Sequence, residues 1–369
     1  MKLETIDAHA VRRIAVLYQA LPPPLIDGLR KDAKPGGYSD SGADIAFCLR
    51  ESGHEVVTPT VAPDASTPMD WVFPDTAEGL ARAVAAGATV FWANTVLFRG
   101  HPIEAYLSRA WIVGQCPARQ QDADDKFTTN QQLRKAGLPV VCAVRVAHTS
   151  RPGVLGLNQL DEARLDRYGL RLPLTVKPIR GRGSQGVSRV DSVPALKQAV
   201  AELIDGGTFG DTVIVEQYLA GEELTVTVMP SPPTRGHAGA PGLPRVLPPV
   251  RRFNHIDGIA PYNGLVAVTQ NSAALSEAQA DAPAVQTIKQ ACAETFRQIG
   301  ALGAIRIDCR ADADGVYRIF DVNMKPNMTG AGRPGREAQD SLSAIAARAL
   351  GWPYAELLQA MLDGAWRAV

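Results

Sequence analysis

The glycine-rich segment at residues 177–186 most constrains what this chain can fold into. It reads Lys177-Pro-Ile-Arg-Gly-Arg-Gly-Ser-Gln-Gly186 and contains a GxGxxG pattern. In a dinucleotide-binding fold that pattern opens a helix whose N-terminus faces a pyrophosphate. Here Val187-Ser-Arg-Val190 follows and favours a second strand. The segment therefore predicts a hairpin lid that folds over phosphates, with Lys177, Gly183 and Ser184 as contacts; a plain flexible hairpin is the alternative.

The first part of the chain alternates between strand and helix patterns. Residues 13–18, 55–59 and 89–93 are short apolar or β-branched runs, and residues 43–53 and 76–86 have helical spacing. Such alternation predicts a parallel sheet flanked by helices. A chain of 369 residues has room for two to three domains. We therefore expect an N-terminal α/β unit at residues 1–122.

The remaining chain predicts two further units of mixed α/β (α+β) character. A central unit at residues 123–214 holds the lid and a helix at 193–205, and a C-terminal unit at 215–369 holds a long helix at 282–299. Residues 231–249 are rich in Pro and Gly. They are interpreted as a surface insertion, with a loop between two strands of a hairpin as the alternative.

A second chemical feature is a predicted hairpin with acidic residues near both strands. Asp308 ends the strand Ile305-Arg-Ile-Asp308, and the facing strand carries Asp321 and Asn323. Residues i and i+2 of a strand point to one face, so these three side chains and Arg306 can meet. Two carboxylates and an amide oxygen form the all-oxygen set that Mg²⁺ prefers. A solvated hairpin face is the alternative.

A third feature is the segment Val215-Glu-Gln-Tyr-Leu-Ala-Gly-Glu-Glu-Leu-Thr225. A strand that ends here can offer backbone groups to a base edge, and a following carboxylate can bind ribose hydroxyls. Taken alone, the segment is better described as a loop.

Composition excludes several other classes of function. Lys plus Arg and Asp plus Glu are 38 each, so the zero net charge gives no whole-chain signal for nucleic acid or an anionic membrane. Five scattered cysteines without a CxxC pair disfavour a disulfide framework. The six histidines lack zinc-ligand spacing, although His255 is a candidate substrate contact. No signal peptide or membrane span is apparent, and a cytoplasmic protein is expected.

Together these features resemble the ATP-grasp superfamily, and within it the D-alanine–D-alanine ligase branch. The resemblance covers residues 125–361 and, weakly, the N-terminal block. It rests on a set of short matches: Asp125-Lys126, Ala136-Gly-Leu-Pro-Val140, Val176-Lys-Pro178 with its lid, residues 215–225, Leu247-Pro-Pro-Val250, Arg306-Ile-Asp308 and Asp321-Val-Asn-Met-Lys-Pro-Asn-Met-Thr329.

The resemblance implies an ATP-grasp fold and a role for each matched residue. Lys126 and Lys177 would contact ATP phosphates, Glu216 with Gln217 and Leu219 would lie by the adenine, and Glu223 would bind the ribose. Asp308, Asp321 and Asn323 would hold Mg²⁺, usually two ions in this family, with Mn²⁺ as an alternative. Arg306, with Lys177, would act in catalysis by stabilising an acyl phosphate and the tetrahedral intermediate.

Departures from the family cluster at the amino-acid pockets. The metal glutamate is Asp321 here, the glycine after the metal asparagine is Asn327, and the family's Lys-Tyr loop keeps only Tyr262. Ser41 stands where the ligases place the glutamate that holds the first alanine. The predicted substrate contacts are Tyr262, Asn327, Ser341 and two arginines of an insertion-like stretch, Arg333 and Arg336.

These departures predict an amino-acid or small-peptide ligase other than the cell-wall enzyme, forming an amide through an acyl phosphate. The alternatives are an ATP-grasp kinase of small molecules, a carboxylase, or a non-catalytic ATP-binding regulatory protein. The partners of the predicted ligase would be small carboxylate and amine substrates. A homodimer is expected by analogy with the related ligases.

Overall fold

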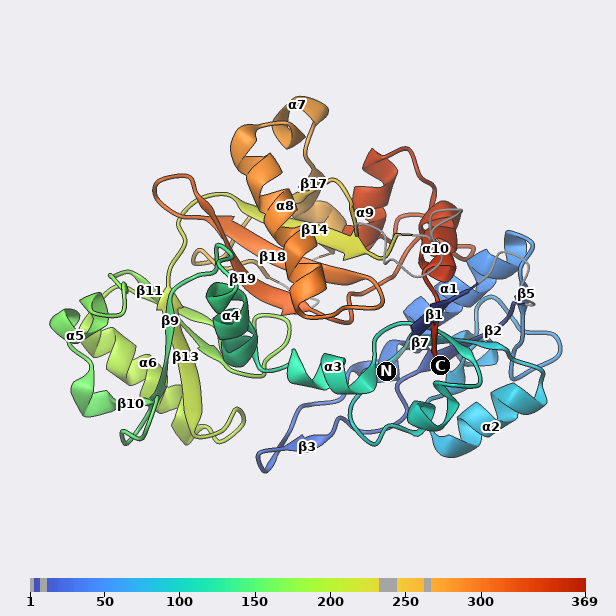
Figure 1. Ribbon diagram of the computed structural model, residues 1–369, viewed down its shortest axis with the longest axis horizontal. Helices are drawn as coiled ribbons and strands as arrows, with labels where there is room; N and C mark the ends of the chain where they lie inside the picture. The colour runs from blue at the N-terminus through green and yellow to red at the C-terminus, as the bar shows by residue number, and fades with distance from the viewer. Residues whose placement is uncertain (1–2, 7–11, 232–243, 262–266) are drawn as a thin grey trace.

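The computed structural model describes residues 3–6, 12–231, 244–261 and 267–369. Within these residues, the strands form three main sheets and one small hairpin. In Figure 1 the central sheet lies at the left, the C-terminal sheet with its long helix at the upper middle, and the N-terminal sheet at the right. The mixture of sheets and helices confirms the predicted α/β class.

The N-terminal sheet is built mainly from parallel strands, as predicted. β2 (Arg13–Tyr18) pairs in parallel with β5 (Glu55–Val56), β6 (Phe73–Pro74) and β7 (Val90–Asn94), and β7 pairs with β8 (Trp111–Val113). The helices α1 (Ser39–Glu51) and α2 (Ala77–Ala85) pack against these strands. Every residue of β7 is buried, as expected for a strand covered on both faces.

The C-terminal end of the chain returns to this first sheet. β20 (Trp366–Ala368) pairs antiparallel with β1 (Leu3–Thr5) and with β8. The two chain ends therefore lie side by side (Figure 1). The range predicted for the C-terminal unit, 215–369, includes a strand that the structure places in the N-terminal sheet, and no sequence pattern indicated that long-range pairing.

The central sheet carries the lid. Its strands run in the order β10 (Leu155–Gly156), β9 (Ala143–Ala147), β13 (Thr212–Gln217), β11 (Leu174–Pro178) and β12 (Ser188–Val190). β11 and β12 are antiparallel, so the glycine-rich segment joins two strands, as predicted. α6 (Val193–Asp205) buries Leu196, Val200 and Ile204 against the sheet at i, i+4 spacing.

The C-terminal sheet holds the acidic hairpin. Its order is β17 (Ser272–Ala274), β16 (Val250–Arg252), β14 (Glu223–Met229), β18 (Ile305–Ala311) and β19 (Tyr317–Asn323). α8 (Pro283–Gln298) packs its apolar stripe on this sheet, and α4 (Lys126–Lys135) lies against β19. β15 (Arg245–Val246) also pairs with β14. The described end of the Pro- and Gly-rich stretch is therefore part of the sheet, which favours the hairpin connection over the predicted insertion.

The other elements are short or close the chain. They are β3 (Leu25–Ile26), β4 (Leu29–Arg30), α3 (Pro117–Asp122), α5 (Glu162–Asp166), α7 (Glu277–Ala280), α9 (Leu342–Ala349), α10 (Tyr354–Asp363) and the 3-10 turns η1 (Pro35–Tyr38), η2 (Pro68–Asp70), η3 (Pro102–Tyr106), η4 (Leu157–Gln159) and η5 (Val268–Gln270). Among the helices of the described ranges, none has the length and apolar character that crossing a bilayer requires.

Candidate active site

The acidic hairpin places its polar side chains opposite one another. In the register of β18 and β19, Asp308 pairs with Asp321 and Arg306 pairs with Asn323. Directly paired residues of an antiparallel ladder project from the same face. The ladder shifts between Asp308 and Cys309, so the regular pairing ends just beyond the acidic pair. The predicted gathering of these four residues is confirmed in its geometry.

Cations hold both carboxylates of this face. Lys126 Nζ donates to Asp321 Oδ1 at 2.7 Å, and Arg306 donates to Asp308 through Nη2 at 2.9 Å and Nε at 3.1 Å. Burial would raise the pKa of the Asp321 carboxyl, but Lys126, Lys177 and Arg306 outweigh it and lower that pKa. Asp321 is therefore ionised over a wide pH range, as a metal ligand must be.

Two further groups orient Asp308. Thr225 Oγ1 donates to Asp308 Oδ1 at 2.8 Å from the neighbouring strand β14, and Asn323 Nδ2 donates to Asp308 Oδ2 at 3.1 Å. Across the described residues, no three His, Cys, Asp or Glu side chains gather in a metal-binding cluster. The set is thus two carboxylates and one amide. Its hard oxygen donors fit a divalent cation whose remaining ligands come from water and nucleotide phosphates.

A buried ion pair lies beside this face, at the strands of the lid unit. Lys177 Nζ is 2.7 Å from Glu216 Oε2 and donates to the carbonyl of Phe320 at 3.0 Å. Burial raises the pKa of Glu216, although the charge of Lys177 opposes the rise. The pair brings β11 and β13 of the central sheet against β19 of the C-terminal sheet, so the two sheets share one site.

Glu223, at the start of β14, is 3% exposed and already engaged. His255 Nε2 lies 2.8 Å from its Oε2, and Arg310 Nη1 lies 3.8 Å from the same oxygen. His255 was predicted as a substrate contact, but the structure brings it to this carboxylate. A ribose at Glu223 would therefore meet a carboxylate that His255 and Arg310 orient.

The predicted nucleotide and metal residues all line one cavity of about 150 Å³ between the central and C-terminal sheets; we call it the nucleotide cavity. Ser184 Oγ donates to the carbonyl of Ala260 at 2.9 Å, and this hydrogen bond holds the lid over the cavity. Small-molecule pockets usually enclose roughly 300–1,000 Å³, so a nucleotide would fit here only if the lid opened. The predicted residues in its wall are Lys126, Lys177, Gly183, Ser184, Glu216, Gln217, Leu219, Glu223, Arg306, Asp308, Asp321 and Asn323.

The same wall contains residues that sequence reasoning missed. Arg310 donates to the carbonyls of Gly221 and Gly258, and thereby fixes the loops on either side of the cavity. Phe320 places its ring 5.6 Å from Lys177 Nζ. Alternation along β18 from Arg306 through Asp308 would have indicated Arg310, whereas no local pattern distinguished Phe320.

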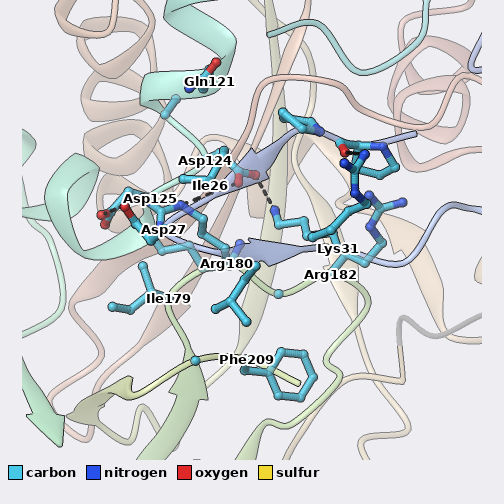
Figure 2. Close-up of a pocket in the computed structure, with 18 of the residues that line it drawn as sticks. Ile26, Asp27, Lys31, Gln121, Asp124, Asp125, Ile179, Arg180, Arg182 and Phe209 are labelled. Atoms are coloured by element: carbon cyan, nitrogen blue, oxygen red, sulfur yellow. Dashed lines mark hydrogen bonds and ion pairs between the residues drawn. The ribbon is translucent and has the colours of Figure 1, made fainter. Parts of the chain in front are cut away.

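A larger cavity of about 670 Å³ lies next to the nucleotide cavity, between the N-terminal unit and the lid; we call it the outer cavity. Figure 2 shows side chains of its wall, including Lys31, Asp124, Arg180 and Arg182. The two cavities share Lys126, Arg182 and Asn323 in their walls. They therefore meet beside the acidic hairpin.

Arg333 and Arg336 are not in the wall of either of these cavities. Arg333 is 5% exposed and donates to Asp44 Oδ1 at 2.8 Å and to Asp40 Oδ1 at 2.5 Å; Arg336 also binds Asp44, at 3.0 Å. Gly332 lets this loop approach α1, because a Cβ there would lie 2.3 Å from the Asp44 carbonyl oxygen. The prediction that these arginines bind substrate is therefore corrected: their charges are neutralised inside the protein.

The other predicted substrate contacts are also placed differently. Ser341 is 2% exposed, and its hydroxyl caps α9 by accepting from the Ala344 amide at 3.2 Å. Asn327 accepts a hydrogen bond from the Thr329 hydroxyl at 3.0 Å, so its side chain closes a local turn. Tyr262 lies outside the described residues.

Comparison with known proteins identifies the family. Residues 133–363, more than half of the chain, match the family model described as the D-Ala–D-Ala ligase C-terminus. The D-alanine–D-alanine ligase of Mannheimia succiniciproducens is 29% identical over 242 residues, covering 65% of this chain and 67% of the relative. The ligase of Ectopseudomonas mendocina is 31% identical over 244 residues, covering 65% of this chain and 64% of the relative.

Solved structures match along nearly the whole chain. The ATP complex of the D-alanine–D-alanine ligase from Bacillus anthracis has a TM-score of 0.64 at 17% identity, covering 96% of this chain and 97% of the other. The VanG D-Ala:D-Ser ligase from Enterococcus faecalis has a TM-score of 0.62 at 16% identity, covering 96% of this chain and 99% of the other. These matches confirm the predicted fold. The chain therefore belongs to the family of the D-Ala–D-Ala ligase C-terminus, and it is an ATP-grasp ligase that forms carbon–nitrogen bonds.

Proposed function

We propose that this ligase uses ATP to activate the carboxylate of one amino acid or small peptide and joins it to the amine of a second. The observation that carries the proposal is the acidic hairpin, where Arg306, Asp308, Asp321 and Asn323 share a face at the junction of two cavities. The nucleotide would occupy the smaller cavity under the lid, and the substrates would occupy the outer cavity.

Lys126 and Lys177 would bind the phosphates. Both lysines are held near the hairpin by carboxylates, Lys126 by Asp321 and Lys177 by Glu216. Burial opposes the charge of Lys126, but Asp321 together with Asp124 and Asp308 outweighs this effect and raises the pKa of the lysine, so its charge is retained. When bound, a divalent cation, Mg²⁺ by its preference for oxygen, would neutralise the triphosphate. The bond between Lys126 and Asp321 would then be exchanged for contacts with phosphate.

The chemistry would proceed in two displacements. A carboxylate oxygen of the first substrate attacks the γ-phosphorus, the bond from phosphorus to ADP breaks, and an acyl phosphate forms. The amine of the second substrate then attacks the acyl carbon, phosphate leaves, and the nitrogen loses a proton. Arg306 would lie where negative charge develops in both steps and would stabilise that charge. The closed lid, held by Ser184, would exclude the water that hydrolyses an acyl phosphate.

An ADP-release assay with paired substrates tests this proposal. Amino acids and dipeptides of both hands are offered with Mg²⁺ and ATP, alone and in pairs. We expect ADP release to require a carboxylate and an amine together, with one amide formed for each ADP. ADP release with a hydroxyl compound alone would indicate a kinase, and bicarbonate dependence would indicate a carboxylase. Nucleotide binding without turnover on any pair would indicate a regulatory protein.

Replacing the Thr225 hydroxyl should weaken metal binding. Thr225→Val keeps the side-chain shape but removes the hydrogen bond to Asp308. Losing such a partner of a metal ligand commonly costs about 10–100-fold in metal affinity. We therefore expect the Mg²⁺ concentration for half-maximal ADP release to rise by about that factor.

Thr227→Val is the matched control for this prediction. Thr227 lies two residues along the same strand, is equally buried, and shares a hydrogen bond with Ser343 at 3.0 Å instead of with Asp308. In Thr227→Val, the Mg²⁺ concentration for half-maximal ADP release should equal that of the wild type. An unchanged Mg²⁺ requirement in Thr225→Val would contradict the prediction that Thr225 orients Asp308 as a metal ligand.

A further inference from the structure

Lys325 presents a buried amino group that has no counter-ion in the described structure. It follows Asn323 by two residues and lies in the wall of the outer cavity. Its Nζ atom is buried, and within the described residues no acceptor reaches it by a hydrogen bond. The nearest favourable contact is the ring of Tyr38, with Nζ 3.2 Å from the ring centroid. A cation–π contact supplies none of the hydrogen bonds that a buried ammonium group normally makes.

Two more basic side chains lie near Lys325. Lys34 Nζ lies 4.4 Å from the Tyr38 centroid, and Arg182 of the lid is a charged neighbour of both lysines. Arg182 Nη1 is also buried and has no hydrogen-bond partner among the described residues. Like charges in one place repel each other and cost stability unless an anion joins them. The cluster thus combines charges from the N-terminal unit, the lid and the segment after the metal asparagine.

Tyr38 itself is held in a strained conformation. Its φ is +67°, in the left-handed region that bulky residues rarely adopt, and it follows two glycines with positive φ. Strain of this kind persists where the surrounding structure fixes a residue, commonly at binding sites. Tyr38 also precedes α1, whose N-terminus has no side-chain cap, so the positive end of that helix adds to the local field.

Four of the five carboxylates in the wall of the outer cavity are bound to other cations, and the fifth, Asp32, is exposed to solvent. In the outer cavity Asp27 and Asp125 bind Arg180, Asp211 binds Arg151, and Asp124 binds Lys31, the last shown in Figure 2. Asp40, which acts on Lys34, is bonded to Arg333 and Arg336. Within the described residues, no carboxylate forms an ion pair with Lys34, Arg182 or Lys325, which we call the cation cluster, so the cluster can accept an anion that enters the cavity.

We propose that the cation cluster binds an anionic side-chain group, a carboxylate or a phosphate, on one of the two substrates, in addition to the α-carboxylates that amino acids carry. This inference rests on the proposed function, because it makes the outer cavity the substrate pocket. The anion would contact Lys325 and Arg182 with Tyr38 beneath it, beside Asn323 of the acidic hairpin. The substrate class is then an acidic amino acid or a phosphorylated one.

Matched pairs of probes test the proposal by binding and by turnover. The pairs are aspartate and asparagine, glutamate and glutamine, and phosphoserine and serine, each of both hands. Calorimetric titration is done on the full chain with Mg²⁺ and a non-hydrolysable ATP analogue. A charge-assisted contact should favour the acidic member of a pair by roughly 10–100-fold in Kd. A preference within the first two pairs identifies a carboxylate, and one within the last pair a phosphate.

Variants assign the preference to the cluster. Lys325→Met removes the charge at similar volume and should abolish the preference, while Lys325→Arg should retain it. Lys31→Met is the matched control in the same cavity, because the charge of Lys31 is already paired with Asp124; the preference should persist. Equal affinity within every pair, or a preference that survives in Lys325→Met, overturns the inference.

The outcome for this inference is separable from that for the proposed function. Anion preference without ADP release on any pair would contradict the ligase reaction and leave the cation cluster supported. ADP release with neutral amino acids and no preference for acidic ones would support the ligase reaction and contradict the proposal that the cation cluster binds an anion.

Discussion

Arg306→Ala should lower the kcat for ADP release by about 10²–10³-fold, the usual effect of removing one donor that stabilises charge in a transition state. The Arg306 guanidinium is fixed by two hydrogen bonds to Asp308, so it is already oriented before substrate arrives. Its interaction strengthens as charge develops on the transferred group, and its loss should therefore appear in kcat rather than in the KM for ATP. Steady-state kinetics at saturating Mg²⁺ measures both constants.

Arg318→Ala is the matched control for this prediction. Arg318 is an arginine on the partner strand β19, but it binds Asp312 at the far end of the hairpin and is partly exposed. Its replacement should leave both constants unchanged. If Arg306→Ala instead keeps the wild-type kcat and raises only the KM for ATP, Arg306 contributes to ATP binding and does not stabilise the transition state.

Arg333→Ala should destabilise the fold by about 3–5 kcal/mol, the range observed when one partner of a buried ion pair is removed. Asp44 is fully buried, and burial raises its pKa while Arg333 and Arg336 oppose the rise. Without Arg333, the Asp44 carboxylate keeps only the half-buried Arg336 as a cationic partner. The midpoint of urea unfolding, followed by circular dichroism, should fall accordingly, whereas the KM of each substrate should stay unchanged in the folded protein.

Arg297→Ala serves as the comparison, because its ion pair with Glu294 is largely exposed on α8. Exposed pairs contribute at most about 1 kcal/mol, so this variant should unfold close to the wild type. A large rise in substrate KM in Arg333→Ala, with unchanged stability, would restore the earlier prediction that Arg333 contacts substrate.

Local patterns predicted the parts of the site that are local in sequence. Alternation along two strands and a Gly-containing turn indicated that Asp308, Asp321 and Asn323 share a face. The register of β18 and β19 places them on one face. The strand pattern after the glycines identified a hairpin lid, and β11 and β12 pair accordingly. Hydrophobic period and turn chemistry are sufficient for such features because neighbouring residues determine them.

Features that join distant segments could not be predicted in this way. Arg333 was taken for a substrate contact because an arginine in a loop carries no sign of its partner; Asp44 lies 289 residues away. The pairing of β20 with β8 likewise depends on how the chain closes. Lys325 was part of a matched motif, but the cluster it forms needs Tyr38 and Arg182 from two other units.

The most direct test of the central claim follows oxygen from the substrate carboxylate. The carboxylate substrate identified by the ADP-release assay is prepared with ¹⁸O in both carboxyl oxygens, and the phosphate released with its amine partner is analysed by mass spectrometry. Attack of the carboxylate on the γ-phosphorus predicts one ¹⁸O atom in each phosphate, together with unlabelled ADP. Unlabelled phosphate, or ¹⁸O recovered in AMP, would contradict the account.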